Sequence, residues 1–216
     1  MSARRFTRYF ADPSFKLGVD EQFAKADAAT KSGICITYAI HDPSQVDHIG
    51  NRTDGLIIYV GQTKEFRKRV RKRMRDAGTA VRRPRDRIDG ACYDIMARGR
   101  VPRFSVLDET DCVLDSLVSE TNWSKRLRNQ GYPLLNQWPE QKFGGIEIDR
   151  RTVPHNWLWP MTAEDAIASK VDLIVSENGQ EIAADLSTFP PSMRLREVRD
   201  LVRSAGRRVR LYIREP

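Results

Sequence analysis

Hydrophobic and polar positions follow strand-like patterns in the first half of the chain. Residues alternate from Ile34 to Ile40, and an apolar, β-branched run extends from Leu56 to Val60, so both stretches predict strands. We expect the two to pair as antiparallel neighbours across a long polar loop, with Gly61-Gln62-Thr63 ending the second strand. A short run from Arg103 to Leu107 predicts a third strand. Together these stretches predict a small antiparallel sheet.

A helix with a narrow buried stripe is predicted directly after the second strand. Phe66, Val70 and Met74 recur every four residues, which places them on one helix face. Arg69 and Arg73 lie beside this stripe, where an arginine needs a partner or a function. The rest of the helix surface is basic and consists of Arg67, Lys68, Arg71, Lys72 and Arg75.

An arginine-rich loop, residues 81–89, is predicted after this helix, and a short helix follows at residues 90–98. Arg82, Arg83 and Arg85 are expected to contact phosphates if nucleic acid passes here, and otherwise to be solvated. The loop therefore extends the basic surface that begins on the preceding helix.

The helix predicted at residues 110–129 carries a carboxylate on its apolar face. That face consists of Val113, Leu117, Ser124 and Leu127. Glu120 falls on the same face, where an ionised carboxylate is costly unless it pairs with a cation or binds a metal. The pattern alone leaves two interpretations open, a structural salt bridge to an arginine and a metal ligand.

The last third of the chain predicts a small α+β region. Residues 171–175 and 181–186 flank Glu177-Asn178-Gly179, which is a hairpin signal, and Val209, Leu211 and Ile213 alternate in a last strand. Between them an amphipathic helix is predicted at residues 192–205. Its inward positions are Leu195, Val198, Leu201 and Val202. Before the hairpin, Trp157 and Trp159 are expected to pack this tail against the preceding core.

These elements predict an α+β chain in three parts. Residues 1–32 form a basic arm and a helix at 19–29, residues 33–140 form the core, and residues 141–216 form an accessory region for DNA binding or dimerisation. The arm, residues 4–10, is basic and aromatic, so it either stacks on bases or packs on its own domain.

Composition and charge indicate a polyanionic partner. The 216 residues are 40% hydrophobic and 31% charged with a net charge of +8, which is typical of a folded protein that binds nucleic acid. No long apolar run or secretory core appears, so we expect a cytoplasmic chain without membrane contact. Cys35, Cys92 and Cys112 are widely spaced and not set among the histidines at ligand spacings, so we expect reduced, buried cysteines and no zinc.

The order of five residues resembles the GIY-YIG nuclease superfamily. Tyr59-Val60-Gly61, followed by a helix with Phe66 and Arg69, looks like the second half of that motif. Tyr38 on the preceding strand fits the first half. The glutamate and the asparagine that the family carries later in the chain are matched by Glu120 and Asn136. The resemblance covers about half of the chain.

The chain departs from the family pattern in three places. Ile36 stands at the glycine of the first tripeptide, unless Gly33-Ile34-Cys35 is the match, in which case Cys35 replaces the tyrosine. We prefer Tyr38, because it alternates with Ile36 and Ile40 as in a strand. The loop between the two tyrosines is long, and Arg73 stands where the family often has a histidine or tyrosine.

The resemblance implies a metal-dependent endonuclease that hydrolyses phosphodiester bonds in double-stranded DNA. It implies that Glu120 holds Mg²⁺ or Mn²⁺, that Arg69 reaches the scissile phosphate, and that Tyr38 is the base with Tyr59 as its partner. Lowering of the tyrosine pKa by Arg69 and the metal is expected. Asn136 positions a phosphate oxygen or locks its loop. The DNA-binding set is Arg67, Lys68, Arg71, Lys72, Arg73, Arg75, Arg82, Arg83 and Arg85.

Several biological roles are compatible with this chemistry. Restriction or defence is favoured, with a homodimer for double-strand cleavage, and a repair or mobile-element nuclease is an alternative. A different class of function is a DNA-binding module on a nuclease fold that does not cut, which the residues Ile36 and Arg73 keep open.

Overall fold

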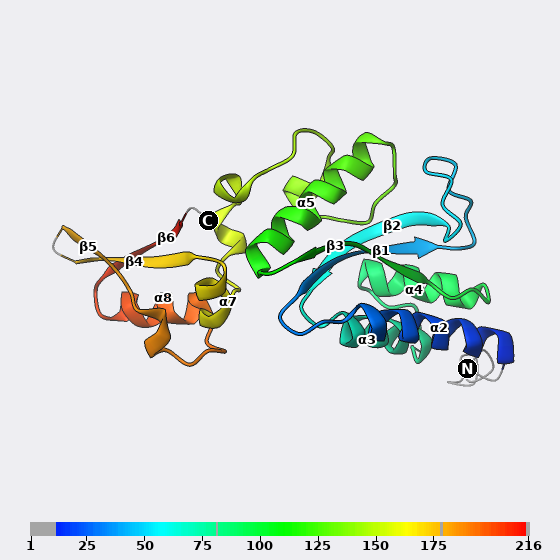
Figure 1. The fold of residues 1–216 in the computed structure, drawn as a ribbon, viewed down its shortest axis with the longest axis horizontal. Coiled ribbons are helices and arrows are strands. Elements are labelled where there is room, and N and C mark those ends of the chain that lie inside the picture. Colours follow the sequence, from blue (N-terminus) through cyan, green and yellow to red (C-terminus); the bar gives the residue numbers. More distant parts are fainter. Residues whose placement is uncertain (1–11, 81, 178, 215–216) are drawn as a thin grey trace. The chain divides into compact units, whose positions relative to one another are not determined.

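The computed structural model describes residues 12–80, 82–177 and 179–214 (Figure 1). The basic arm at residues 4–10, together with Val81 and Asn178, lies outside the described residues. The described chain is α+β, with seven α-helices and two three-stranded antiparallel sheets. No helix in this part of the chain is long and apolar enough to cross a membrane.

The chain forms two compact units. Unit 1 comprises the described residues up to Thr110 together with Ser119–Glu147, and unit 2 comprises Asp111–Val118 and the described residues from Ile148 onward. The elements of unit 1 are α2 (Pro13–Ala29), β1 (Cys35–Asp42), β2 (Leu56–Thr63), α3 (Phe66–Gly78), α4 (Arg87–Ala97), β3 (Arg103–Thr110), the later part of α5 (Val113–Asn129) and α6 (Pro139–Lys142). The predicted division at residues 32 and 140 stays a prediction.

The sheet of unit 1 has the strand order β2-β1-β3, and β1 pairs antiparallel with both neighbours. The prediction that β1 and β2 pair is confirmed. The expected end of β2 at Gly61 was wrong, because Gly61, Gln62 and Thr63 continue the ladder opposite Tyr38, Thr37 and Ile36. Glycine does not break a strand when its backbone is held by a partner on the neighbouring strand.

A β-bulge interrupts the pairing of β1 with β2. Ile40 pairs with Tyr59 and the next residue, His41, pairs with Ile57, so Ile58 has no partner of its own on β1. Because of this bulge, Ile58 and Tyr59 pack toward one core cluster, whereas Ile57 and Val60 pack toward another. A bulge changes the direction in which a side chain points, and here it sets the face of Tyr59.

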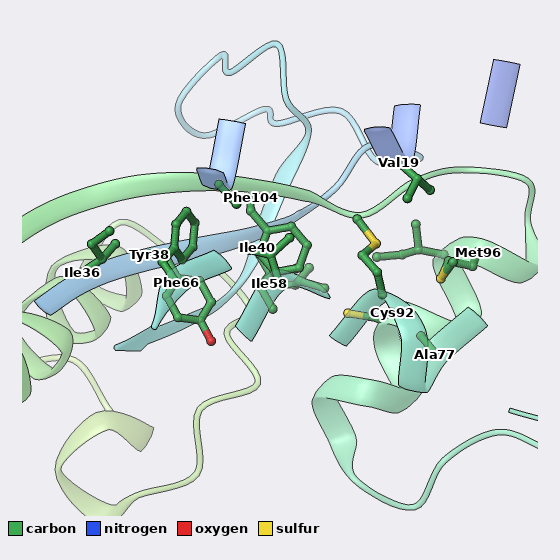
Figure 2. Packing of buried hydrophobic residues seen from close by; sticks show 14 of the residues in the cluster. Val19, Ile36, Tyr38, Ile40, Ile58, Phe66, Ala77, Cys92, Met96 and Phe104 are labelled. Carbon is green, nitrogen blue, oxygen red and sulfur yellow. The ribbon is translucent and has the colours of Figure 1, made fainter. Parts of the chain in front are cut away.

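Helices cover both faces of this sheet (Figure 1). On one face, side chains of α2, α3 and α4 enclose a cluster with Tyr38, Ile40 and Phe104 (Figure 2). The predicted stripe of Phe66, Val70 and Met74 is buried in it, as expected. On the other face, Leu127 of α5 packs with Ala39, Ile57, Val60, Tyr132 and Leu134. Unit 1 is therefore a layer of helices, a sheet and a covering helix.

Two helix starts differ from the sequence prediction. The arginine-rich loop was expected to extend to Asp89, but α4 begins at Arg87 because the Asp86 side chain accepts hydrogen bonds from the amides of Ile88 and Asp89. The long helix was expected from residue 110, whereas β3 continues to Thr110 and α5 begins at Val113.

Unit 2 has its own sheet, with strand order β5-β4-β6. Its elements are α7 (Ala163–Ala168), β4 (Val171–Glu177), β5 (Gln180–Ala183), α8 (Leu195–Ser204), β6 (Arg208–Ile213) and the short 3₁₀ turns Arg150–Thr152, His155–Trp157 and Leu186–Thr188. The predicted hairpin is confirmed by pairing of β4 with β5. The predicted second strand was too long, because residues 186–188 form a 3₁₀ turn.

The core of unit 2 corrects two further expectations. Leu195 and Val198 are buried as predicted, but Leu201 is 53% exposed because α8 turns that position toward solvent. Trp157 and Trp159 were expected to pack against the preceding core. They pack instead within unit 2, where the Arg199 guanidinium lies 5.0 Å from the Trp159 ring. Val113, Leu114 and Val118 of α5 contribute to this same cluster.

Candidate active site

The two tyrosines of the predicted motif lie on adjacent strands of unit 1. Tyr38 on β1 and Tyr59 on β2 have ring centroids 6.3 Å apart. Tyr38 is 1% exposed and packs against the Phe66 ring at 5.3 Å. Its hydroxyl oxygen, the red atom in Figure 2, lies at the edge of the apolar cluster and points away from it. The structure thus brings the two phenols together at the boundary of the core.

Gly61 leaves room for both rings. A Cβ at this position would lie 2.7 Å from Cε1 of Tyr59 and 2.9 Å from the hydroxyl oxygen of Tyr38. Real Cβ atoms do not approach other atoms this closely, so the glycine of the Tyr59-Val60-Gly61 tripeptide is needed for the tyrosines to occupy their places.

We expect Gly61→Ala to lower the unfolding free energy by about 1–3 kcal/mol and to reduce any activity that depends on the two tyrosines. The added methyl group must displace a ring, and both rings are packed against the core. Urea unfolding measures the loss. An unfolding midpoint equal to that of the wild type would contradict the close approach seen here.

Burial keeps both phenols protonated. Desolvation raises the pKa of Tyr38 to about 12, while the charges of Arg69 and Arg73 act in the opposite direction. Burial also raises the pKa of Tyr59 well above its ordinary value, and the Glu120 carboxylate adds to that rise. The protein's own groups therefore raise the pKa of both tyrosines, contrary to the expected lowering. Desolvation outweighs the effect of Arg69 and Arg73.

The arginines beside the helix stripe have different partners. Arg69 is partly buried and forms no ion pair with any residue that the structure describes, so its charge acts on Tyr38, Tyr59 and Glu120. Arg73 has a side chain 12% exposed, donates to Asp86 at 3.2 Å and forms a close ion pair with Asp89. Its Nε is buried without a partner. Among the nine residues predicted to bind DNA, Arg73 therefore lies inside the protein rather than on an exposed surface.

Glu120 is buried on the inner face of α5. Its side chain is 6% exposed, and burial raises the pKa of its carboxyl to about 8, against a hydrogen bond from Gln141 and the charge of Arg69. Glu120 forms no ion pair with the described residues. Of the two interpretations from the sequence, the structural salt bridge is therefore wrong. A buried carboxyl of this kind is a candidate functional group.

Asn136 is fixed to the strand that carries Tyr59. Its Oδ1 accepts a hydrogen bond from the Val60 amide at 3.1 Å, and its Nδ2 donates to the Val60 carbonyl at 2.8 Å. The same Nδ2 donates to Oε1 of Gln141 at 3.1 Å. The side chain is 3% exposed. Two roles were predicted for Asn136. These contacts agree with the second role, in which Asn136 locks its loop.

Two residues at this site were not singled out by the sequence. Gln141 accepts a hydrogen bond from Asn136 and lines the same cavity as Glu120. Arg128 of α5 donates to the carbonyls of Gln141, Leu134 and Asn136 at 2.7–3.0 Å. Gln141 lay in a stretch interpreted as a connector, and Arg128 follows one residue after the predicted helix stripe ends. No local pattern marks either residue, because their partners are distant in the chain.

Glu120, Asn136, Gln141 and Tyr59 share the wall of a cavity of about 250 Å³. The remaining lining residues are Asp86, Arg87, Ile88, Leu135, Gln137 and Trp138. Tyr38 is not among the lining residues that the structure describes. The cavity lies entirely within unit 1 and has both a carboxyl group and carboxamides on its surface.

A basic groove lies along the outer face of α3. It has a volume of about 520 Å³ and is lined by Thr63, Glu65, Lys68, Arg69, Arg71, Lys72 and Arg75. Carboxylates partly neutralise it, since Arg67 and Arg71 pair with Asp27, Lys68 pairs with Glu65, and Lys72 and Arg75 pair with Asp76.

The arginines that follow α3 are exposed. Arg83 pairs with Asp94 at 2.9 Å, whereas Arg82 and Arg85 have no ion pair with any residue that the structure describes. The pairs on α3 and at Arg83 are exposed, so each contributes little to stability and is easily exchanged for a phosphate contact.

The cavity offers few protein ligands for a metal ion. Within the described ranges, no group of three or more histidine, cysteine, aspartate or glutamate side chains could hold a metal. One buried carboxylate beside a cavity is compatible with Mg²⁺, which is often bound by one or two carboxylates together with water and substrate phosphates. Cys35, Cys92 and Cys112 form no disulfide in the described part of the chain, and all three are buried, as expected.

No family description, curated protein or solved structure matches this chain.

Proposed function

We propose that this protein is a metal-dependent endonuclease that hydrolyses phosphodiester bonds in double-stranded DNA, as GIY-YIG nucleases do. One observation carries the proposal. Tyr59, Glu120 and Asn136, from separate parts of the sequence, line one cavity of unit 1. Tyr38 lies on the strand beside Tyr59, and the charge of Arg69 acts on Glu120 and on both tyrosines. A core that needed only packing would not collect these polar groups.

The cation is assigned to Glu120. Mg²⁺ or Mn²⁺ would take up the charge that develops on the phosphate and would lower the pKa of a water bound to it. Binding of a divalent ion requires the ionised carboxylate, which burial disfavours, so binding of the metal and release of the proton are coupled. Arg69 lines the basic groove and forms no ion pair among the described residues, and in this proposal its forked guanidinium donates to a phosphate oxygen.

The tyrosines are assigned to proton transfer. Tyr38 is the proposed base and Tyr59, at the cavity wall, its hydrogen-bonding partner. Only a small fraction of a phenol with a pKa of about 12 is ionised at neutral pH. The rate should therefore rise with pH as the ionised fraction of Tyr38 grows. Asn136 holds the strand of Tyr59 against the loop after α5 through both Val60 hydrogen bonds.

Nicking of supercoiled plasmid tests the proposal directly. We expect conversion to the nicked or linear form with MgCl₂ or MnCl₂ and none with a chelator. Conversion to the linear form without a nicked intermediate would indicate that two copies act together, as proposed for a restriction or defence nuclease. Absence of nicking on any DNA would favour the binding-module alternative, which the raised pKa of both tyrosines supports.

The exposed arginines give a prediction for DNA affinity. We expect the triple substitution Arg82→Gln, Arg83→Gln and Arg85→Gln to weaken binding on every sequence alike. Each lost phosphate contact should lower the slope of log affinity against log salt by roughly 0.9. Fluorescence anisotropy across a salt series measures the slope. Lys16→Gln, an exposed charge on α2, is the control. A triple variant with the wild-type slope would remove these arginines from the binding surface.

Arg69→Ala should behave differently from that triple variant. Because Arg69 interacts electrostatically with Glu120 and both tyrosines, we expect it to lose cleavage rate far more than affinity. Single-turnover cleavage, measured beside the salt series, separates the two effects. If Arg69→Ala lost only the affinity of one phosphate contact, Arg69 would be one more residue of the basic groove.

A further inference from the structure

We propose that Trp138 is a substrate-contact residue whose indole ring stacks on a nucleobase next to the phosphate that occupies the cavity. The proposal rests on the proposed function, because it concerns the same cavity, and it adds the class of DNA that the site takes, namely DNA with an unpaired base beside the cleaved bond. It is carried by the position of Trp138 on the cavity wall, by its exposure and by the neighbouring cation Arg87.

The lining of the cavity is buried in one part and exposed in another. Glu120, Asn136 and Gln141 are 6%, 3% and 2% exposed. The exposed lining residues form its rim and are Asp86, Arg87, Gln137 and Trp138. The volume of about 250 Å³ is smaller than the roughly 300–1,000 Å³ of pockets that enclose a drug-sized ligand. The cavity therefore fits one part of a larger substrate, and the rest of that substrate lies over the rim.

Trp138 is more exposed than the other tryptophans of the chain. It is 44% exposed, whereas Trp157 is 8% exposed in the core of unit 2, and Trp123 and Trp159 are partly buried. Tryptophan carries a large apolar surface and is highly buried in most proteins, so an exposed indole marks a surface that contacts a ligand or a partner. Here the indole stands at the entrance to the proposed active site.

The backbone at Trp138 is held in place by several hydrogen bonds. The amides of Gln141 and Lys142 donate to the Trp138 carbonyl at 2.9 and 2.8 Å and begin α6. Arg128 of α5 donates to the carbonyls of Asn136 and Gln141 at 3.0 and 2.7 Å, on either side of Trp138 in the chain. None of these bonds involves the indole. The ring is therefore presented by a fixed backbone, and its replacement leaves those bonds in place.

A nucleotide matches the two kinds of group on this rim. Arg87 is exposed at the first position of α4 and forms no ion pair with any residue that the structure describes, so its guanidinium is available to a phosphate. Asp86, also on the rim, accepts hydrogen bonds from two amides of α4 and from Arg73, which compensate its charge. The indole offers a flat ring to a base. A nucleotide carries both an anionic phosphate and a flat base.

Stacking on Trp138 requires a base whose face is open. Within a duplex the neighbouring bases cover both faces, and unstacking costs free energy that is smallest for a mismatched or single-stranded base. Every base has a π-face, so stacking on an aromatic side chain distinguishes little between sequences. The rim therefore selects DNA with an unpaired base, as in a mismatch, a bulge or a single-stranded end, rather than a particular base.

Binding to single strands with and without bases tests the proposal. Oligo(dT) presents open bases at every position, and an abasic sugar–phosphate chain of equal length has the same charge. By fluorescence anisotropy we expect Trp138→Ala to weaken binding to oligo(dT) by about 5- to 150-fold, the range for one stacked base, and to leave binding to the abasic chain unchanged. Trp138→Phe retains a ring and should lose less affinity.

Phe143→Ala is the matched control. It removes a nearby aromatic side chain that is 67% exposed but is not among the lining residues that the structure describes, so its affinity for both strands should equal that of the wild type. Quenching of tryptophan fluorescence gives a second readout. Oligo(dT) should quench the emission of the wild type and of Phe143→Ala, and Trp138→Phe should lose this quenching.

Cleavage separates the proposal from the proposed function. On duplexes with and without a bulged base, the wild type should cut the bulged DNA faster, and Trp138→Ala should lose that preference. If the wild type cleaves no DNA, the proposed function fails while both binding measurements still test Trp138. Equal affinity of the wild type for oligo(dT) and the abasic chain, unchanged oligo(dT) affinity in Trp138→Ala, or quenching that persists in Trp138→Phe would overturn the proposal.

Discussion

Glu120→Gln is expected to abolish cleavage while leaving DNA binding nearly intact. The substitution keeps the size of the side chain but replaces one acceptor oxygen by an NH₂ donor and removes the negative charge that is assigned to the cation. A bound metal contributes several kcal/mol of transition-state stabilisation, so the rate should fall by several powers of ten. Single-turnover cleavage and anisotropy on the same DNA measure the two effects. Cleavage within about tenfold of the wild type would exclude Glu120 as the metal ligand.

The same substitution has an expected effect on stability that does not depend on activity. The pKa of Glu120 is raised from 4.5 to about 8, so between these values the folded chain retains a proton that the unfolded chain has released. Unfolding free energy therefore falls as the pH rises through this window. Glu120→Gln removes the titrating group and should raise Tm at pH 8.5 relative to the wild type.

Metal ions should affect the stability of the wild type but not that of Glu120→Gln. MgCl₂ should raise Tm of the wild type at pH 8.5, since it binds only the folded chain, and should leave Glu120→Gln unaffected. Glu21→Gln, an exposed glutamate on α2, is the matched control and should respond to MgCl₂ as the wild type does. An equal response of all three proteins would place the cation elsewhere.

Tyr38→Phe is expected to be the more damaging of the two tyrosine substitutions. It deletes the proposed base but keeps a ring against Phe66, so packing should be retained. General-base contributions amount to about 10² to 10⁴ in rate. Because burial raises the pKa of Tyr38 to about 12, the wild-type rate should increase with pH above neutrality, and Tyr38→Phe should lose that increase.

Tyr59→Phe and Cys35→Ser complete the comparison. Tyr59→Phe should lose less rate, because Tyr59 is assigned as a partner and not as the base. Cys35→Ser should be mild in its effect on rate, since Cys35 is fully buried at the start of β1. If Cys35→Ser were crippling and Tyr38→Phe mild, the first half of the motif would be matched at residues 33–35 and the base would be misassigned.

The sequence by itself determined the elements that have a strong local pattern. The alternation around Tyr38 predicted β1, the spacing of Phe66, Val70 and Met74 predicted the buried stripe of α3, and the hairpin of β4 and β5 followed from its turn residues. It also placed Glu120 on a buried helix face. Such predictions succeed because hydrophobic periodicity reports directly on which side of an element is buried.

Element ends and some exposures were decided by partners that the local pattern does not contain. β2 continues past Gly61 because β1 supplies hydrogen bonds there, α4 begins early because Asp86 caps it, and Leu201 of α8 is exposed although its spacing predicted burial. The two tryptophans joined the core of unit 2 rather than the preceding one. Each of these outcomes depends on which distant residues are present.

The arrangement of the candidate site was decided mainly by tertiary structure. Strict alternation along β2 would set Tyr59 opposite Ile58, but the bulge turns both toward the cluster that contains Tyr38. Arg69 and Arg73 were equivalent in the sequence. The structure distinguishes them, because Arg73 pairs with Asp86 and Asp89 at the start of α4, whereas Arg69 forms no ion pair with the described residues. Gln141 gained its place through Asn136, Arg128 and the backbone of Val60. Hydrogen bonds between residues far apart in the chain leave no periodic signal, so the sequence alone supplied the chemical groups while the fold decided which of them meet.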